Sequence, residues 1–149
     1  MTDYKKVILG DVFELNTKKG NIMLQYVYHG SIEFVKVIQA FYSEIPEDIE
    51  SFIENNEMFV VQFPVKAAFS KKIVKKIAHA NINFVLPKYM KHRIINKDGV
   101  KGWTIVDTKT YKMRFTETLK EDEKLLFPWG VWNDTLLIER LENNWQIND

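Results

Sequence analysis

The histidines are the first residues whose chemistry could make this chain a metal protein or an enzyme. There are three, His29, His79 and His92, and no two of them stand four residues apart or at another spacing found in zinc-binding motifs. The chain has no cysteine, which excludes thiolate ligands, disulfides and a cysteine nucleophile. The spacing therefore predicts no metal site, and we interpret the histidines as turn or surface residues.

Motifs for nucleophilic catalysis and phosphate binding are also missing from the sequence. Ser70 precedes Lys71 and Lys72, but a serine-lysine pair of the S-x-x-K type needs a lysine at position 73, where Ile73 stands. The six glycines are spaced as turn residues and form no phosphate-binding loop. We therefore expect no catalytic residue and no cofactor, and we interpret Ser70 as a turn residue.

Two carboxylates near the start of the chain, Asp11 and Glu14, leave an acid–base hypothesis open. Paired carboxylates can act as general acid and base where a fold brings them into one pocket, although two exposed carboxylates are far more common. These residues leave open a hydrolase that uses Asp11 and a histidine, which is a weaker hypothesis than the two binding functions considered below.

Positive charge is concentrated in the middle of the chain, and acidic residues cluster on both sides of it, in residues 44–57 and 117–123. Such a basic stretch could bind nucleic acid, with Tyr89 and other aromatics stacking on bases. The more common interpretation is a solvated lysine-rich face, and this charge distribution can steer a charged protein partner. The basic residues are Lys71, Lys72, Lys75, Lys76, Lys88, Lys91, His92 and Arg93.

The four tryptophans lie in the last third of the chain, at positions 103, 129, 132 and 145. Tryptophans are usually buried, but they also act as anchors in protein interfaces. Trp129 lies between Pro128 and Gly130, in an expected surface loop. The predicted partner-binding residues are therefore Lys75, Lys76 and Trp129.

Length and composition are those of one domain with a sizeable core, covering residues 1–149, in which 46% of the residues are hydrophobic and 13% aromatic. The formal net charge of +1 gives no general attraction to nucleic acid or to an anionic membrane. The N-terminus lacks the apolar region of a signal peptide, and no apolar run approaches the ~18 to 20 residues that span a bilayer. We expect a cytoplasmic protein without a membrane partner.

Hydrophobic patterns predict a meander of three strands, then a short helix opened by Pro46 and a fourth strand. The next stretch is ambiguous: alternation favours a strand over residues 65–69, while residues 72–80 fit a helix as well as a strand. The expected first strands are residues 7–15, 21–28, 32–41 and 58–63, and the helix lies within residues 45–56.

In the second half, we expect irregular chain over residues 86–93 and a hairpin of residues 102–107 and 111–115. Short helices are predicted over residues 118–126 and 135–142, with Asp134 as the N-cap of the last one. The sequence therefore predicts the α+β class: a mainly antiparallel, strongly twisted or barrel-like sheet with two or three short helices.

Three segments of the chain form a recognisable set. They are Gly10-Asp11-Val12-Phe13-Glu14-Leu15, Lys101-Gly102-Trp103-Thr104-Ile105-Val106-Asp107, and the stretch from Trp132-Asn133-Asp134 through Leu141, with Trp145. In order and spacing these segments resemble the bacterial Immunity protein 26 family of polymorphic toxin systems. The C-terminal block is the most specific, whereas residues 44–93 match only in their proline punctuation. The resemblance slightly favours a strand over residues 72–80.

The resemblance implies a non-catalytic immunity protein that neutralises a cognate toxin domain by tight binding, without a cofactor. It carries over no contact residues. The shared positions have a structural interpretation as well, with Gly10 in a tight backbone, Asp134 as a cap, and Trp103 and Trp145 in the core. The alternative function is a nucleic-acid or nucleotide-binding module that uses the lysine-rich middle.

Overall fold

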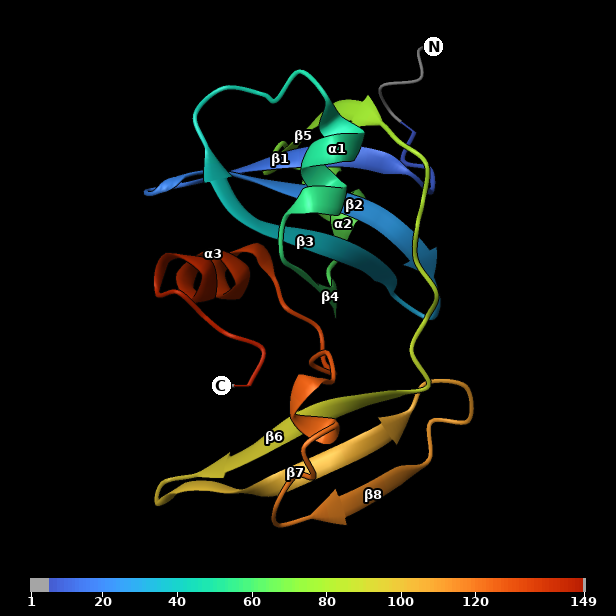
Figure 1. The fold of residues 1–149 in the computed structure, drawn as a ribbon, viewed down its shortest axis with the longest axis vertical. Coiled ribbons are helices and arrows are strands. Elements are labelled where there is room, and N and C mark those ends of the chain that lie inside the picture. Colours follow the sequence, from blue (N-terminus) through green and yellow to red (C-terminus); the bar gives the residue numbers. More distant parts are fainter. Residues whose placement is uncertain (1–5, 149) are drawn as a thin grey trace. The chain divides into compact units, whose positions relative to one another are not determined.

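A computed structural model describes residues 6–148, which form two compact units (Figure 1). The first unit holds residues 6–84 and 131–145, and the second holds residues 85–130 and 146–148. Each unit is built on an antiparallel sheet, which confirms the predicted α+β class. The sequence predicted one domain over residues 1–149, with no linker between these units. No helix of the described residues is long and apolar enough to cross a membrane.

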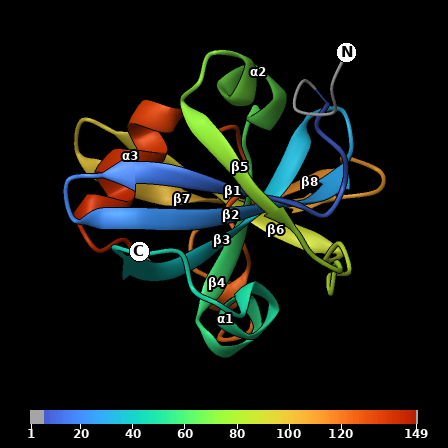
Figure 2. The ribbon, with the colours of Figure 1, turned by 90° about the horizontal axis from the view of Figure 1, so that it is seen from above.

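The first unit contains a five-stranded antiparallel sheet in the order β4-β3-β2-β1-β5, whose twist is visible in Figure 2. The predicted meander of the first three strands is confirmed. Residues 72–80, which the sequence left open, contain a strand. The strands are β1 (Asp11–Thr17), β2 (Gly20–His29), β3 (Glu33–Tyr42), β4 (Met58–Gln62) and β5 (Val74–His79).

Two short helices cover opposite faces of this sheet. The helix α1 (Ile49–Asn55) packs Ile53 with Val12 of β1, and Asp48 caps it by accepting a hydrogen bond from the Ser51 amide. The helix α2 (Val65–Ser70) packs Phe69 edge-on against Phe13, with ring centroids 5.7 Å apart. Val12 and Phe13 are consecutive strand residues, and their side chains therefore point to opposite faces.

The predicted strand over residues 65–69 is wrong, because this segment is the helix α2. Val65 and Ala68 are buried, and a spacing of three residues places both on one side of a helix. Ala67, which the alternating pattern would have placed beside Val65 and Phe69, is exposed. The segment is too short for alternation to decide between the two structures.

The last helix, α3 (Asp134–Glu142), has Asn133 as its N-cap, so the predicted cap at Asp134 is wrong. The Asn133 Oδ1 atom accepts a hydrogen bond from the Leu136 amide at 2.8 Å, and Asn133 has extended backbone. Asp134 instead lies in the first helical turn, where its charge favours the positive end of the helix dipole. Two adjacent residues of capping type made the boundary ambiguous by one position.

Aromatic residues fix this helix to the first unit. The Trp145 ring lies 4.7 Å from Phe59 and 5.2 Å from Trp132, and Arg140 of α3 stacks over Trp132. Trp132 is buried, and its amide donates a hydrogen bond to Gln62 at the end of β4. The C-terminal block that carries the family resemblance therefore has a packing role in this unit.

The second unit contains a three-stranded sheet in the order β6-β7-β8, and the predicted hairpin of β7 and β8 is confirmed. The expected irregular chain over residues 86–93 is wrong from Tyr89 onward, because these residues pair with β7. The predicted helix over residues 118–126 is reduced to one 3-10 turn. The elements are β6 (Tyr89–Asn96), β7 (Gly99–Asp107), β8 (Met113–Thr116) and η2 (Glu123–Leu125).

Side-chain bonding explains why the helix over residues 118–126 does not form. The Glu123 carboxylate accepts a hydrogen bond from the Lys120 amide and pairs with Arg114 of β8. The Lys120 amide first, and then Arg114, lower the pKa of Glu123 against the opposing effect of burial. Lys91 is also buried here, and its ammonium donates to the carbonyls of Lys124 and Ile147. The bonds from Arg114 and Lys91, which lie outside residues 118–126, override the local helical preference.

Candidate functional site

A groove of about 1040 Å³ lies in the first unit and is lined by α2, the turn after it, and parts of β5 and β1. Its size is at the upper end for small-molecule pockets, which span about 300 to 1,000 Å³. Within residues 6–148, four lysines line it, against one acidic residue. The charged and aromatic lining residues are Glu14, Lys66, Phe69, Lys72, Lys75 and Lys76.

The lysines of this groove differ in how freely they can meet a ligand. Lys66, Lys72 and Lys75 are exposed, and each lies on a different element: α2, the turn, and β5. Glu14, the only acidic group among the described lining residues, accepts a hydrogen bond from the Tyr42 hydroxyl at 2.9 Å. Burial, and then this carboxylate, raise the pKa of Tyr42, so the hydroxyl stays protonated and keeps the carboxylate engaged. The groove therefore presents positive charge to its contents.

Lys72 has an unusual backbone in the turn between α2 and β5. Its φ is +63°, in the left-handed region where glycine is the common residue after a helix. The turn is closed by hydrogen bonds from the Lys72 amide to Phe69 and from the Ile73 amide to Ala68. This backbone conformation is less favourable for a lysine than for a glycine. The lysine adds one positive charge to the groove.

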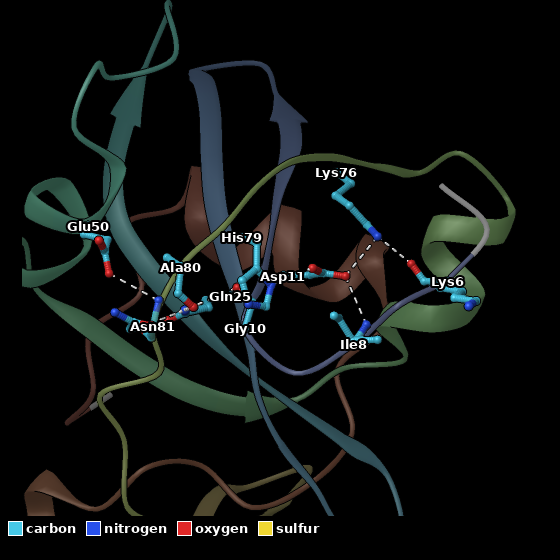
Figure 3. Close-up of polar contacts among 10 residues, drawn as sticks. All are labelled: Lys6, Ile8, Gly10, Asp11, Gln25, Glu50, Lys76, His79, Ala80 and Asn81. Carbon is cyan, nitrogen blue, oxygen red and sulfur yellow. Dashed lines mark hydrogen bonds and ion pairs between the residues drawn. The ribbon is translucent and has the colours of Figure 1, made fainter. Parts of the chain in front are cut away.

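Lys76 belongs to a second polar centre, which is organised by Asp11 (Figure 3). Asp11 is 3% exposed, and one carboxylate oxygen accepts from the Ile8 amide and pairs with Lys76, both at 3.0 Å. The other oxygen lies 3.0 Å from His79 Nδ1. Burial raises the pKa of Asp11, but the Ile8 amide, His79 and Lys76 together outweigh it and lower the pKa below its usual value. Asp11 is therefore an ionised, fully bonded carboxylate.

Gly10 and Gln25 complete this centre (Figure 3). Gly10 has a φ of +98°, and a Cβ atom there would lie 2.7 Å from the His79 ring and 2.9 Å from the Ala80 carbonyl oxygen. The buried Gln25 side chain donates through Nε2 to the carbonyls of Gly10, Ala80 and Asn81. Its Oε1 atom has no hydrogen-bond partner among the described residues. The centre thus holds the chain before β1 against the chain after β5.

The structure brings together Asp11 and His79, the pair that a hydrolase hypothesis would use, but it separates Asp11 from Glu14. Asp11 bonds to Lys76 and His79, whereas Glu14 bonds to Tyr42. The other two histidines bond elsewhere: His29 contacts the Tyr26 hydroxyl and His92 the Trp129 carbonyl. Residues 6–148 contain no cluster of three histidine or carboxylate side chains that could hold a metal ion.

The basic stretch predicted from the sequence is divided between the two units. Lys71 to Lys76 belong to the first unit, whereas Lys88 to Arg93 belong to the second. Of the predicted partner-binding residues, Lys75 is exposed, while the Lys76 ammonium is held by Asp11 and by the Lys6 carbonyl at 2.5 Å. Trp129 lies in the second unit, partly buried, with its ring 5.9 Å from Tyr111. Its role in binding stays a prediction.

Sequence reasoning missed Lys66 as a lining residue of the groove. As the second residue of a presumed strand, it had no relation to Lys72 and Lys75. A helix over residues 65–70 would have placed Lys66 and Ser70 on one side, four residues apart, and both line the groove. The available signal was the proline at position 64, which is common at the start of a helix.

Two of the residues on which the proposed resemblance rests have clear structural roles in these units. Gly10 has the backbone that only glycine adopts easily, as the structural interpretation expected, and Trp145 packs on Phe59. Trp103 is partly buried beneath the Lys91 ammonium, which lies 5.5 Å from the ring centroid. In comparisons with known proteins, no family model, curated protein or solved structure matches the chain.

Proposed function

We propose that this chain is a non-catalytic immunity protein that works in the bacterial cytoplasm, where it neutralises a cognate toxin domain by direct binding. The observation that carries the binding face is the open groove in which Lys66, Lys72 and Lys75 are exposed around one engaged carboxylate. The toxin as partner rests on the resemblance to the Immunity protein 26 family. A cationic surface of this kind accelerates association with an acidic partner and suppresses wrong partners.

The bonding of the Asp11 centre supports a structural role for it rather than a catalytic one. Both carboxylate oxygens are engaged, and the three donors come from the chain before β1 and from β5. Such a centre closes one end of the sheet and holds β5, the strand that lines the groove, in place. A rigid, preorganised surface is what tight binding requires, because ordering a loose one on association costs affinity.

The direct test is coexpression with the toxin reading frame beside the gene. The chain should protect cells, form a stoichiometric complex with the toxin, and lose affinity when Lys66, Lys72 and Lys75 are all changed to Glu. The loss should be greatest in association rate at low salt, because screening at about 0.15 M salt has a length of about 8 Å. A matched control reverses Lys19, Lys97 and Lys101, which are exposed and outside the groove.

If the two triple variants have equal effects on toxin binding, the groove is not the binding face. If the chain neither binds nor neutralises the toxin, the immunity function is refuted. The second candidate function, nucleic-acid binding, is favoured by the same three exposed lysines. It predicts that the groove variant loses affinity for single-stranded DNA or RNA, with a steep salt dependence, and that toxin binding is absent.

A further inference from the structure

The strand β5 forms an edge of the five-stranded sheet. Within the described residues it pairs with β1 alone, through Glu14–Lys75 and the neighbouring pairs. An edge strand has a row of backbone donors and acceptors that can pair with another chain, and proteins commonly block such edges with lysines. β5 carries Lys75 and Lys76. Their positive charge disfavours pairing with a cationic strand and favours pairing with an acidic one.

From the groove and this edge together we infer the occupant: an extended acidic segment of the protein partner, which pairs through its backbone with β5 and places its carboxylates among the groove lysines. The inference rests on the proposed function and names the part of the toxin that the groove holds. Adding a strand to a sheet edge is a known mode of peptide recognition, in which main-chain bonds give affinity and side-chain pockets give specificity.

The shape and charge of the groove favour this occupant over a small anion. A volume of about 1040 Å³ exceeds what one phosphate or carboxylate fills, and the groove continues along Val74, Lys75 and Lys76 of β5. Side chains on one face of an added strand repeat about every 6.6 to 6.8 Å. Alternate carboxylates on the face of the strand that turns toward α2 could therefore meet Lys66 and Lys72. Lys75 is in register with Glu14 and points to the other face of the sheet, where an intervening carboxylate would meet it.

Lys72 supports the same conclusion because its charge is held at a position where the backbone disfavours it. Its left-handed φ of +63° would suit glycine, which would also close the turn but would leave the groove with one lysine fewer. Backbone strain of this kind is common at binding sites. Lys72 therefore acts as a recognition residue, and Lys72→Gly should weaken binding of the acidic segment without weakening the fold.

The test uses a fluorescent glutamate-rich peptide that carries carboxylates on both faces of an extended strand, titrated into the full chain at low salt. We expect saturable binding that falls at least tenfold in Lys72→Glu and Lys75→Glu, and about threefold or more in Lys72→Gly. Hydrogen exchange of the β5 amides should slow when the peptide is bound. A peptide with N-methylated backbone amides on alternate residues, which keeps all charges, should bind at least tenfold more weakly.

Equal binding of the N-methylated peptide, with unchanged exchange at β5, would overturn strand addition. Stronger binding by single-stranded oligothymidylate than by the peptide, with the same lysine dependence, would overturn the acidic protein segment as occupant. The toxin assay separates this inference from the proposed function. If the toxin binds and the peptide does not compete with it, the inference fails and the immunity function stands. If the toxin does not bind, the proposed function fails whatever the peptide does.

Discussion

The change Asp11→Asn tests whether the polar centre holds β5 in place through charge. It preserves the size of the side chain and one acceptor oxygen but removes the negative charge that faces Lys76 and His79. The remaining oxygen can still accept from the Ile8 amide, and the new amide group can donate to a neutral His79 ring whose Nδ1 is unprotonated. The variant therefore loses charge-assisted bonding while keeping most of the geometry.

The magnitude follows from how much water can replace the lost charge. Hydrogen bonds to charged groups contribute about 1.5 to 3 kcal/mol each, whereas exposed ion pairs contribute only about 0 to 1 kcal/mol. The Asp11 side chain is 4% exposed, but the Lys76 and His79 side chains are 25% and 55% exposed, so water can replace part of the lost bonding of both side chains in the variant. We expect Asp11→Asn to lower the free energy of unfolding by about 1 to 3 kcal/mol at neutral pH.

The effect of pH on stability has a defined sign. The pKa of Asp11 is lowered in the folded chain, against about 3.9 for an unfolded aspartate. A lowered folded pKa means that ionised Asp11 stabilises the fold fully above the unfolded pKa and that this contribution disappears as pH falls through the folded pKa. The wild type should therefore lose stability between about pH 5 and the acid limit faster than Asp11→Asn does.

Urea unfolding, followed by circular dichroism from pH 7 to pH 3, measures both quantities. The difference in unfolding free energy between the two proteins should be constant near neutral pH and should shrink as the pH falls. Far-ultraviolet spectra of the folded variants provide the control for structure, and Asp98→Asn, which changes an exposed carboxylate in the second unit, provides the control for net charge. A difference that stays constant down to pH 3 would show that charge at Asp11 does not stabilise the fold.

Three further predictions use urea unfolding. Gln25→Met should change the unfolding free energy by less than about 1 kcal/mol, because the lost hydrogen bond to the Ala80 carbonyl is offset by removal of the unpaired Oε1 atom. Gln25→Glu should lower the unfolding free energy by more than about 3 kcal/mol at pH 7, because it buries a charge. Equal changes in the two variants would contradict this prediction. Asn133→Ala should lower the unfolding free energy by about 0.5 to 2 kcal/mol, and Asp134→Ala should lower it less. A larger loss in Asp134→Ala would show that Asp134 is the N-cap. Lys72→Gly should raise stability by up to about 1 kcal/mol, and destabilisation would show that the left-handed turn carries no strain.

The strands could be predicted where local pattern and tertiary environment agree. β2 and β3 alternate or run apolar between clear turn residues, and their positions came out within one or two residues. α2 could not be predicted in the same way, because six residues hold too few periods to separate a helix from a strand. Its structure is decided by packing of Phe69 on Phe13, fifty-six positions earlier in the chain, which no local pattern contains.

The candidate site depended even more on long-range pairing. Asp11 and His79 stand out singly as titratable residues, but only the antiparallel pairing of β1 with β5 makes them partners. The same pairing takes Lys76 out of the set of free surface charges and leaves Lys75 in it, although the two lysines are adjacent and identical in type. Charge density in a sequence therefore locates a basic surface, and the bonds in the fold decide which of its charges can meet a partner.

The residues that carry the family resemblance and those that line the groove have different roles in the first unit. Trp132 and Trp145 build the packing that holds α3, and Gly10 allows the close approach of the chain to His79. The groove lysines lie within residues 44–93, the part of the chain where the resemblance is weakest. An immunity protein needs a stable scaffold and a surface that fits its own toxin. The proposed immunity function would use this division between packing residues and exposed lysines, because partner choice could then change without changing the core.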